Sequence, residues 1–148
     1  MPIKNRFAEL YPTIVKWRHD FHRNPELQYE LPKTAAKVAD LLRSFGCDEV
    51  VEGVGKSGVV GVIHGQVDTS RRVIGLRADM DALPIDEKSD VLYKSEVPGV
   101  MHACGHDGHT AMLLGAAQYL CETRNFDGKA AVIFQPAEEG LSLIHISE

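Results

Sequence analysis

The sequence predicts an α/β fold, in which helices pack on a sheet of β-strands. Three observations support this: two amphipathic segments open the chain, two β-branched runs follow, and a strand–helix–strand pattern comes last. Such an order of elements is typical of α/β sheets. The length of 148 residues, with 44% apolar and 25% charged side chains, corresponds to one ordinary globular domain.

The first two elements are predicted to be helices. Apolar residues recur at helical spacing over residues 11–23, and Pro12 is acceptable in a first helical turn. The second helix is expected over residues 32–45, where Gly46 provides a natural C-cap. The segment 22–27, which contains a histidine and a glutamate, could line a functional cavity or cap the first helix, and we favour the structural role.

Strands and one more helix are predicted after these two helices. Residues 49–54 and 57–64 are rich in β-branched side chains, and the Gly-Lys pair between them indicates a hairpin. Residues 71–79 have the pattern of a buried strand and are followed by a long loop, 80–106.

The remaining segments complete a strand–helix–strand unit. The segment 108–124 is apolar on most faces, so we expect a buried helix. The last predicted strand, 129–134, is rich in Ala, Val and Ile.

Residues that can carry chemistry stand at the ends of these elements. Asp79 and Asp81 end one strand, Glu138 and Glu139 follow another, and Cys104 lies just before the buried helix. Ligands of α/β sheets bind beyond the carboxyl ends of the strands. We therefore expect the three segments to meet at one edge of the sheet.

The stretch Cys104-Gly105-His106 is typical of a metal site. Thiolate and imidazole groups are ligands of zinc and related divalent ions, and Gly105 allows the turn that would aim both at one site. The helix N-terminus nearby is expected to lower the pKa of Cys104. The alternative is a buried free cysteine beside surface histidines, which the nearby His residues and downstream Glu pair disfavour.

The pair Glu138-Glu139 follows Pro136. Adjacent side chains of a regular strand point to opposite faces, but the proline ends the strand and Gly140 allows a bend. Both carboxylates can then face one cavity, one as a metal ligand and one as a general base. The alternative is a solvated acidic turn, the commonest environment of two adjacent glutamates.

Asp79 and Asp81 share one face of their strand because side chains alternate with a period of two. One of them could orient a metal-binding imidazole. The alternative is that an aspartate caps the strand end. His64 and His145 are interpreted as incidental.

Bulk properties exclude several partners. The net charge is −5 without a basic cluster, which argues against nucleic acid or anionic membranes. The apolar runs are too short to span a bilayer, and the N-terminus lacks the pattern of a signal peptide. Three cysteines without framework spacing favour a reducing cytoplasm.

Four ordered motifs carry a family resemblance. They are residues 18–27, 75–85 (Gly-Leu-Arg-Ala-Asp-Met-Asp-Ala-Leu-Pro-Ile), 101–109 (Met-His-Ala-Cys-Gly-His-Asp-Gly-His) and 134–140 (Phe-Gln-Pro-Ala-Glu-Glu-Gly). Together, over about residues 5–140, they resemble the M20 metallopeptidase family in its amidohydrolase branch. That branch holds hippurate hydrolases, N-acyl-amino-acid amidohydrolases and indoleacetyl-amino-acid hydrolases.

The resemblance implies a three-layer α/β/α, zinc-peptidase-like catalytic domain with two divalent metal ions. Zinc or manganese is expected, with cobalt and nickel as alternatives. By motif position, Cys104, His106 and Glu139 correspond to metal ligands and Glu138 to the general base. Asp81 stands where the wider family has the carboxylate that supports a metal-binding histidine.

Two further residues are assigned by the same resemblance. Asp79 stands where other branches have that histidine, and His109 corresponds to a position near the ligands or the substrate. The implied substrate is a small N-acyl amino acid, and the parent protein is expected to be a homodimer or other homo-oligomer.

The chain also departs from the family pattern. Residues 1–140 correspond to the N-terminal part of the catalytic domain, and the family's dimerisation or lid domain and later His ligands have no counterpart. Residues 141–148 form an atypical tail that resembles translated sequencing-adapter sequence. We therefore expect this chain by itself to be weak or inactive and, with an unpaired sheet edge, to self-associate.

Two other functions remain as alternatives. The chain could bind metal without catalysis, or Cys104 could act as the nucleophile of a cysteine hydrolase with a nearby histidine as base. The second alternative leaves the Glu138-Glu139 pair without a role.

Overall fold

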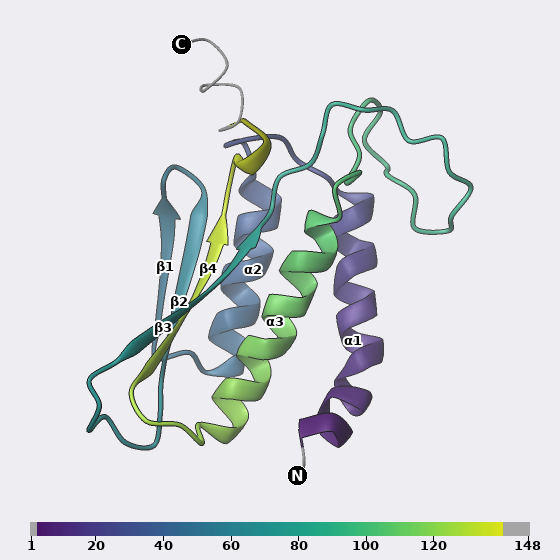
Figure 1. The fold of residues 1–148 in the computed structure, drawn as a ribbon. Helices are drawn as coiled ribbons and strands as arrows, with labels where there is room; N and C mark the ends of the chain where they lie inside the picture. The colour runs from purple at the N-terminus through teal and green to yellow at the C-terminus, as the bar shows by residue number, and fades with distance from the viewer. Residues whose placement is uncertain (1–2, 141–148) are drawn as a thin grey trace.

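The computed structural model describes residues 3–140, which contain a four-stranded sheet, three helices and a helical stretch at 138–140 just after the last strand (Figure 1). The elements in chain order are α1 (Ile3–Arg23), α2 (Pro32–Phe45), β1 (Glu49–Val54), β2 (Gly58–His64), β3 (Val73–Asp79), α3 (His106–Thr123) and β4 (Lys129–Gln135). The predicted α/β class and the type and order of all elements are confirmed. His145 and the tail lie outside the described residues.

The sheet has the strand order β1-β2-β4-β3. β1 and β2 form the predicted antiparallel hairpin, and β2 pairs antiparallel with β4. β3 and β4 are parallel, and Asp79 lies opposite Gln135 at their carboxyl ends. This register brings the ends of two predicted site segments side by side.

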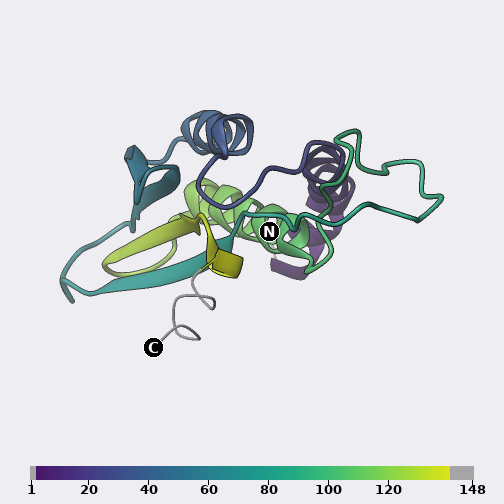
Figure 2. The same ribbon diagram turned by 90° about the horizontal axis from the view of Figure 1, so that it is seen from above.

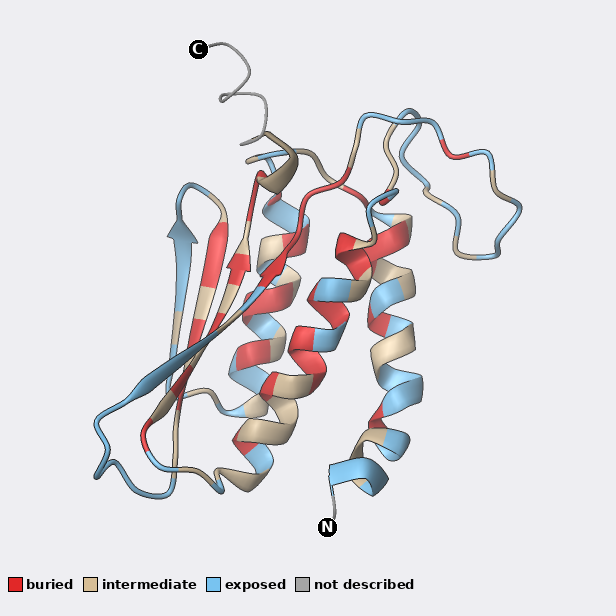
Figure 3. Cartoon of the chain, in the orientation of Figure 1, coloured by how far each residue is buried: buried red, intermediate tan, exposed pale blue. Residues whose placement is uncertain are grey.

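The helices form one layer on the sheet. α2 and α3 pack on the same face, and α1 packs against α3 (Figure 2). A second helical layer, as in a three-layer architecture, is not among residues 3–140. The core lies between the helices and the sheet (Figure 3). Its fully buried side chains include Leu42, Val59, Ile63, Leu114 and Val132.

Helix α1 begins at Ile3, so the predicted start at residue 11 is wrong. The helix continues through Pro12, although a proline inside a helix removes one backbone hydrogen bond. Packing of the first turns offsets this loss. Leu10 is buried, and the Phe7 ring lies 5.4 Å from the Tyr119 ring of α3.

Two glycines set helix boundaries. Gly46 adopts the left-handed conformation with φ 88° and caps α2, as predicted. Gly105 has φ 82° and directly precedes α3, which begins at His106 rather than at residue 108. The left-handed turn at Gly105 lets the helix start immediately, so that His106 stands in the first turn.

The segment 80–105 connects β3 to α3. Its base is closed by two backbone hydrogen bonds of 3.0 Å between Leu83 and Met101, and its middle projects beyond the adjacent ends of α1 and α3 (Figure 1). Among residues 3–140 we find no helix long and apolar enough to cross a membrane.

Candidate functional site

The carboxyl ends of β3 and β4 and the first turn of α3 meet around the imidazole of His106. The Nε2 atom of His106 lies 3.6 Å from Asp79 Oδ2, 3.7 Å from Glu138 Oε2 and 3.7 Å from Glu139 Oε1. His106 is only 4% exposed. The three segments that the sequence predicted to converge do converge here.

The other ring nitrogen fixes how His106 is protonated. Its Nδ1 atom lies 2.8 Å from the backbone carbonyl oxygen of Asp81. A carbonyl oxygen only accepts hydrogen bonds, so Nδ1 carries the proton and donates. In the neutral ring the Nε2 lone pair then faces the carboxylates, which is the orientation of a metal-binding histidine.

Asp81 holds the glutamate pair by its backbone. The carboxylate of Asp81 is buried, and its two oxygens accept hydrogen bonds of 3.1 Å each from the amide groups of Glu138 and Glu139. A carboxylate that accepts two backbone N–H groups fixes the turn that presents both glutamates. Asp81 thus faces the backbone of this turn rather than the open side of the site.

The bend that turns both glutamates to one side lies at Ala137. β4 ends before Pro136, as predicted, but the left-handed residue is Ala137, with φ 54°, and not Gly140. Ala137 is fully buried, and its N–H donates to the carbonyl oxygen of Gln28 at 3.0 Å. A non-glycine residue in this conformation needs such support, and that tertiary contact is invisible in the local sequence.

Asp79 and His109 extend the site along β3. Nδ1 of His109 lies 2.7 Å from Asp79 Oδ1. Burial of Asp79 opposes its ionisation, but the hydrogen bond from His109 and the nearby His106 hold the pKa of Asp79 below its usual value. The side chain of His109 is 48% exposed and borders a surface hollow of about 330 Å³ that Arg77 and Met112 also line.

Cys104 is exposed and in hydrogen-bond contact with Glu139. This contact, partial burial and the nearby carboxylates of Glu138 and Asp81 raise the pKa of the Cys104 thiol to about 11. The expectation of a lowered pKa was wrong because the acidic side chains outweigh the effect of the helix N-terminus.

The donor groups fit a divalent cation. The ligand atoms of Asp79, His106 and His109 lie within 4.8 Å of one another, and the same holds for His106, Glu138 and Glu139. Imidazole and carboxylate donors suit zinc and manganese, and the neighbouring thiol adds a softer donor that favours zinc.

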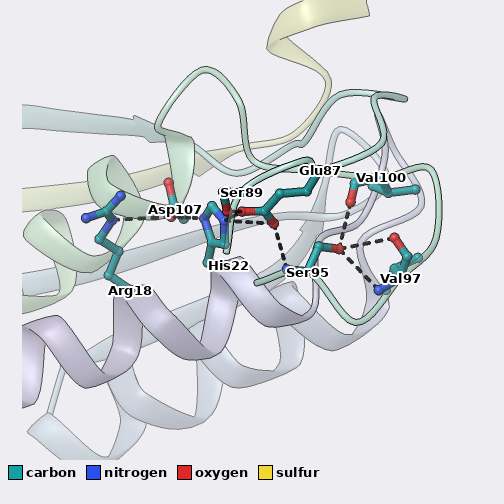
Figure 4. Close-up of polar contacts among 8 residues, drawn as sticks. All are labelled: Arg18, His22, Glu87, Ser89, Ser95, Val97, Val100 and Asp107. Atoms are coloured by element: carbon teal, nitrogen blue, oxygen red, sulfur yellow. Dashed lines mark hydrogen bonds and ion pairs between the residues drawn. The ribbon is translucent and has the colours of Figure 1, made fainter. Parts of the chain in front are cut away.

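A buried ionic network joins α1, the loop 80–105 and the first turn of α3, next to the site (Figure 4). The sequence did not predict this network. Nδ1 of His22 lies 2.8 Å from Asp107 Oδ2, and Nε2 of His22 lies 3.1 Å from Glu87 Oε1. Arg18 approaches the same Asp107 oxygen at 3.3 Å. His22 is therefore more than a helix end, because it ties α1 to the loop and to the residue after His106.

Glu87 is the loop's contribution to this network. Burial opposes its ionisation, yet hydrogen bonds from Ser89, the Ser95 amide and His22 outweigh it and lower the pKa of Glu87 to about 2. His102 lies beside His22, and neither of its ring nitrogens has a hydrogen-bond partner within residues 3–140. Burial lowers the pKa of His102 to about 4.

The sheet edge and its donor cluster define an α/β protein of the class whose ligand site lies beyond the carboxyl ends of the strands. Residues 75–147 match the model of Peptidase family M20/M25/M40, and the chain belongs to this family, as its motifs indicated.

Named relatives and solved structures agree with this assignment. The hippurate hydrolase of Campylobacter jejuni is 55% identical over 133 residues, which are 90% of this chain and 34% of the relative. The N-acyl-L-amino acid amidohydrolase of Geobacillus stearothermophilus is 44% identical over 138 residues, 93% of this chain and 36% of the relative.

Among solved structures, the YXEP protein of Bacillus subtilis, a dinuclear metal-binding peptidase from the M20 family, superposes with a TM-score of 0.83 at 39% identity. The match covers 89% of this chain and 36% of that one. The chain thus spans about a third of the length of these relatives.

Proposed function

We propose that this chain is part of a metal-dependent amidohydrolase that cleaves the amide bond of N-acyl amino acids. The observation that carries the proposal is the Nε2 atom of His106, which faces carboxylates from the ends of two neighbouring strands. The substrate class is supported by relatives named hippurate hydrolase and N-acyl-L-amino acid amidohydrolase, since hippurate is itself an N-acylated glycine.

Cys104, His106 and Glu139 are the proposed ligands of a site for two divalent ions, zinc or manganese. Asp79 and His109 form a second group of donors with His106, and the exposed His109 borders the hollow where a substrate would lie. The bound ions would polarise the amide carbonyl and lower the pKa of a water molecule.

Glu138 is the proposed general base. Its side chain is 39% exposed, and its Oε2 atom lies 3.7 Å from His106 Nε2, at the centre of the cluster. This carboxylate would take a proton from the attacking water and deliver it to the leaving nitrogen. Asp81 would fix the base by holding the amides of Glu138 and Glu139.

The chain by itself is expected to be a weak catalyst. It spans about a third of the relatives' length, so the parent protein would supply further donors, substrate contacts and the surface through which copies assemble. Weak or absent turnover is therefore expected of the 148-residue chain, even if it binds metal.

The test measures zinc binding and amide hydrolysis on the same samples. Cys104→Ser and Glu139→Gln should each weaken zinc binding by at least about tenfold, since ligands and their immediate supports contribute this much. The matched control is Glu49→Gln, which removes a carboxylate from the exposed face of β1. Equal zinc affinity in all four proteins would contradict the assigned site.

Hydrolysis of N-benzoylglycine then separates the alternatives. A slow rate that a chelator and Glu138→Gln both abolish supports the amidohydrolase. Tight zinc binding without turnover supports a metal-binding fragment. Sensitivity to iodoacetamide without sensitivity to chelator supports Cys104 as nucleophile, which a thiol pKa of about 11 disfavours.

A further inference from the structure

Two cysteines outside the candidate site are in contact. Cys47 lies in the connection between α2 and β1, and Cys121 lies in the last turn of α3, 74 positions further along the chain. Their sulfur atoms are 3.6 Å apart. Gly61 of β2 lies beside this pair, and a Cβ atom there would be in ordinary van der Waals contact with the Cys47 sulfur, at 3.5 Å.

Arg124 holds the two cysteine-bearing segments together. It follows α3 directly, and its Nη2 atom donates to the carbonyl oxygen of Gly46 at 2.7 Å. Its Nη1 atom donates to Asp48 Oδ2 at 2.7 Å and to the carbonyl oxygen of His64 at 2.9 Å. The guanidinium therefore binds Gly46 and Asp48, the residues on both sides of Cys47, and holds them against the end of α3.

The sulfur pair has the properties that thiol–disulfide exchange requires. Cys47 is partly exposed, whereas Cys121 is 8% exposed. The hydrogen bond between the thiols lowers the pKa of Cys121, helped by Arg124, and raises that of Cys47, so one proton leaves readily and the other is retained.

We propose that Cys47 and Cys121 form a redox modification site that small-molecule disulfides, such as oxidised glutathione, convert into an intramolecular disulfide. Cys121 first gives up its proton to water, and its thiolate then takes the proton of Cys47 while the accessible Cys47 sulfur attacks a sulfur of the small disulfide. The first small thiolate leaves and is protonated by water. Cys121 then loses its proton and attacks the Cys47 sulfur of the mixed disulfide, which releases the second small thiol.

The exchange balances and has a single intramolecular product. The protein dithiol loses two hydrogen atoms and two electrons, and the small disulfide is reduced to two thiols. Cys104 cannot take part within one molecule, because it precedes an 18-residue helix and Cys121 stands near the other end. At a rise of 1.5 Å per residue, Cys104 and Cys121 are about 25 Å apart along the helix. The site is thus independent of the proposed hydrolase reaction.

The test treats the reduced chain with oxidised glutathione, blocks free thiols with iodoacetamide and maps the products by mass spectrometry. The expected product is a monomer with a Cys47–Cys121 crosslink, the mass loss of two hydrogen atoms, and an alkylated Cys104. Cys104→Ser should crosslink as the wild type does. Cys121→Ser should instead accumulate a glutathione adduct on Cys47.

A further variant separates positioning from mere proximity. Arg124→Gln removes the guanidinium that holds both segments and should slow the crosslinking several-fold without changing which cysteines are joined. The proposal is overturned if the wild type shows a stable glutathione adduct on Cys47 without crosslinking. It is equally overturned by crosslinks that form only between molecules or through Cys104.

Discussion

The stability of the loop network should depend on pH through Glu87. The pKa of this carboxyl is 4.5 in its ordinary state and about 2 in the folded chain. The group is therefore ionised and stabilising above the unfolded pKa, and its contribution is lost as pH falls through the folded pKa. This difference between the unfolded and folded pKa of Glu87 corresponds to about 3 kcal/mol of the free energy of unfolding near pH 6 and about half of that near pH 3.

The variant Glu87→Gln isolates this contribution because all other titrating groups are common to both proteins. The free energy of unfolding is measured by urea denaturation from pH 6 to pH 3, with the fluorescence of the only tryptophan, the buried Trp17, as the signal. We expect the wild type to be more stable near pH 6 and the difference to narrow by about half near pH 3. A difference that stays constant over this range would refute the ionic role of Glu87.

Three other outcomes are expected. Asp81→Asn leaves one of the two glutamate amides facing an NH₂ group, so it should lower the free energy of unfolding by about 2 kcal/mol in urea titrations and weaken zinc binding. If both the free energy of unfolding and the zinc affinity were unchanged, Asp81 would not hold the glutamate pair. Leu114→Ala in the fully buried core should cost about 2–5 kcal/mol, and a loss below 1 kcal/mol would mean that the core is loosely packed. Ile74→Lys, on an edge strand where Ile74 is 62% exposed, should shift the chain toward monomer on a sizing column, whereas an unchanged elution volume would place self-association elsewhere.

The type and order of the elements followed from local patterns, because each helix and strand buries one face against the same core. The boundaries followed less well. The start of α1 was missed because Pro12 looks like a first-turn residue, while the packing of Phe7 against Tyr119, which extends the helix, joins residues far apart in the sequence. The C-cap at Gly46 was predictable because it depends only on the backbone of one residue.

The site, too, has features that the sequence predicted and features that it did not. The convergence of Asp79, His106 and the Glu138-Glu139 pair was predictable because parallel strands end at one edge and a helix begins there. The raised pKa of Cys104 was not, because it depends on how closely the carboxylates approach the thiol.

The His22 network escaped prediction for another reason. Its partners, Glu87 and Asp107, stand 65 and 85 positions away, and each of them has an ordinary local interpretation as a loop acid or a helix-start acid. Only the folded chain shows that both ring nitrogens of one buried histidine face carboxylates.

Asp81 connects the three segments of the site, which are distant in the sequence. Its carbonyl oxygen accepts from His106 and so aims the imidazole, while its carboxylate accepts from the amides of Glu138 and Glu139 and so aims the glutamates. The end of β3 thereby sets the position of the first turn of α3 and of the turn after β4 from a single residue. Because His106 is held by the backbone carbonyl of residue 81 and the glutamates by its carboxylate, substitution of the Asp81 side chain should disturb the glutamate pair and leave the hydrogen bond to the His106 imidazole in place.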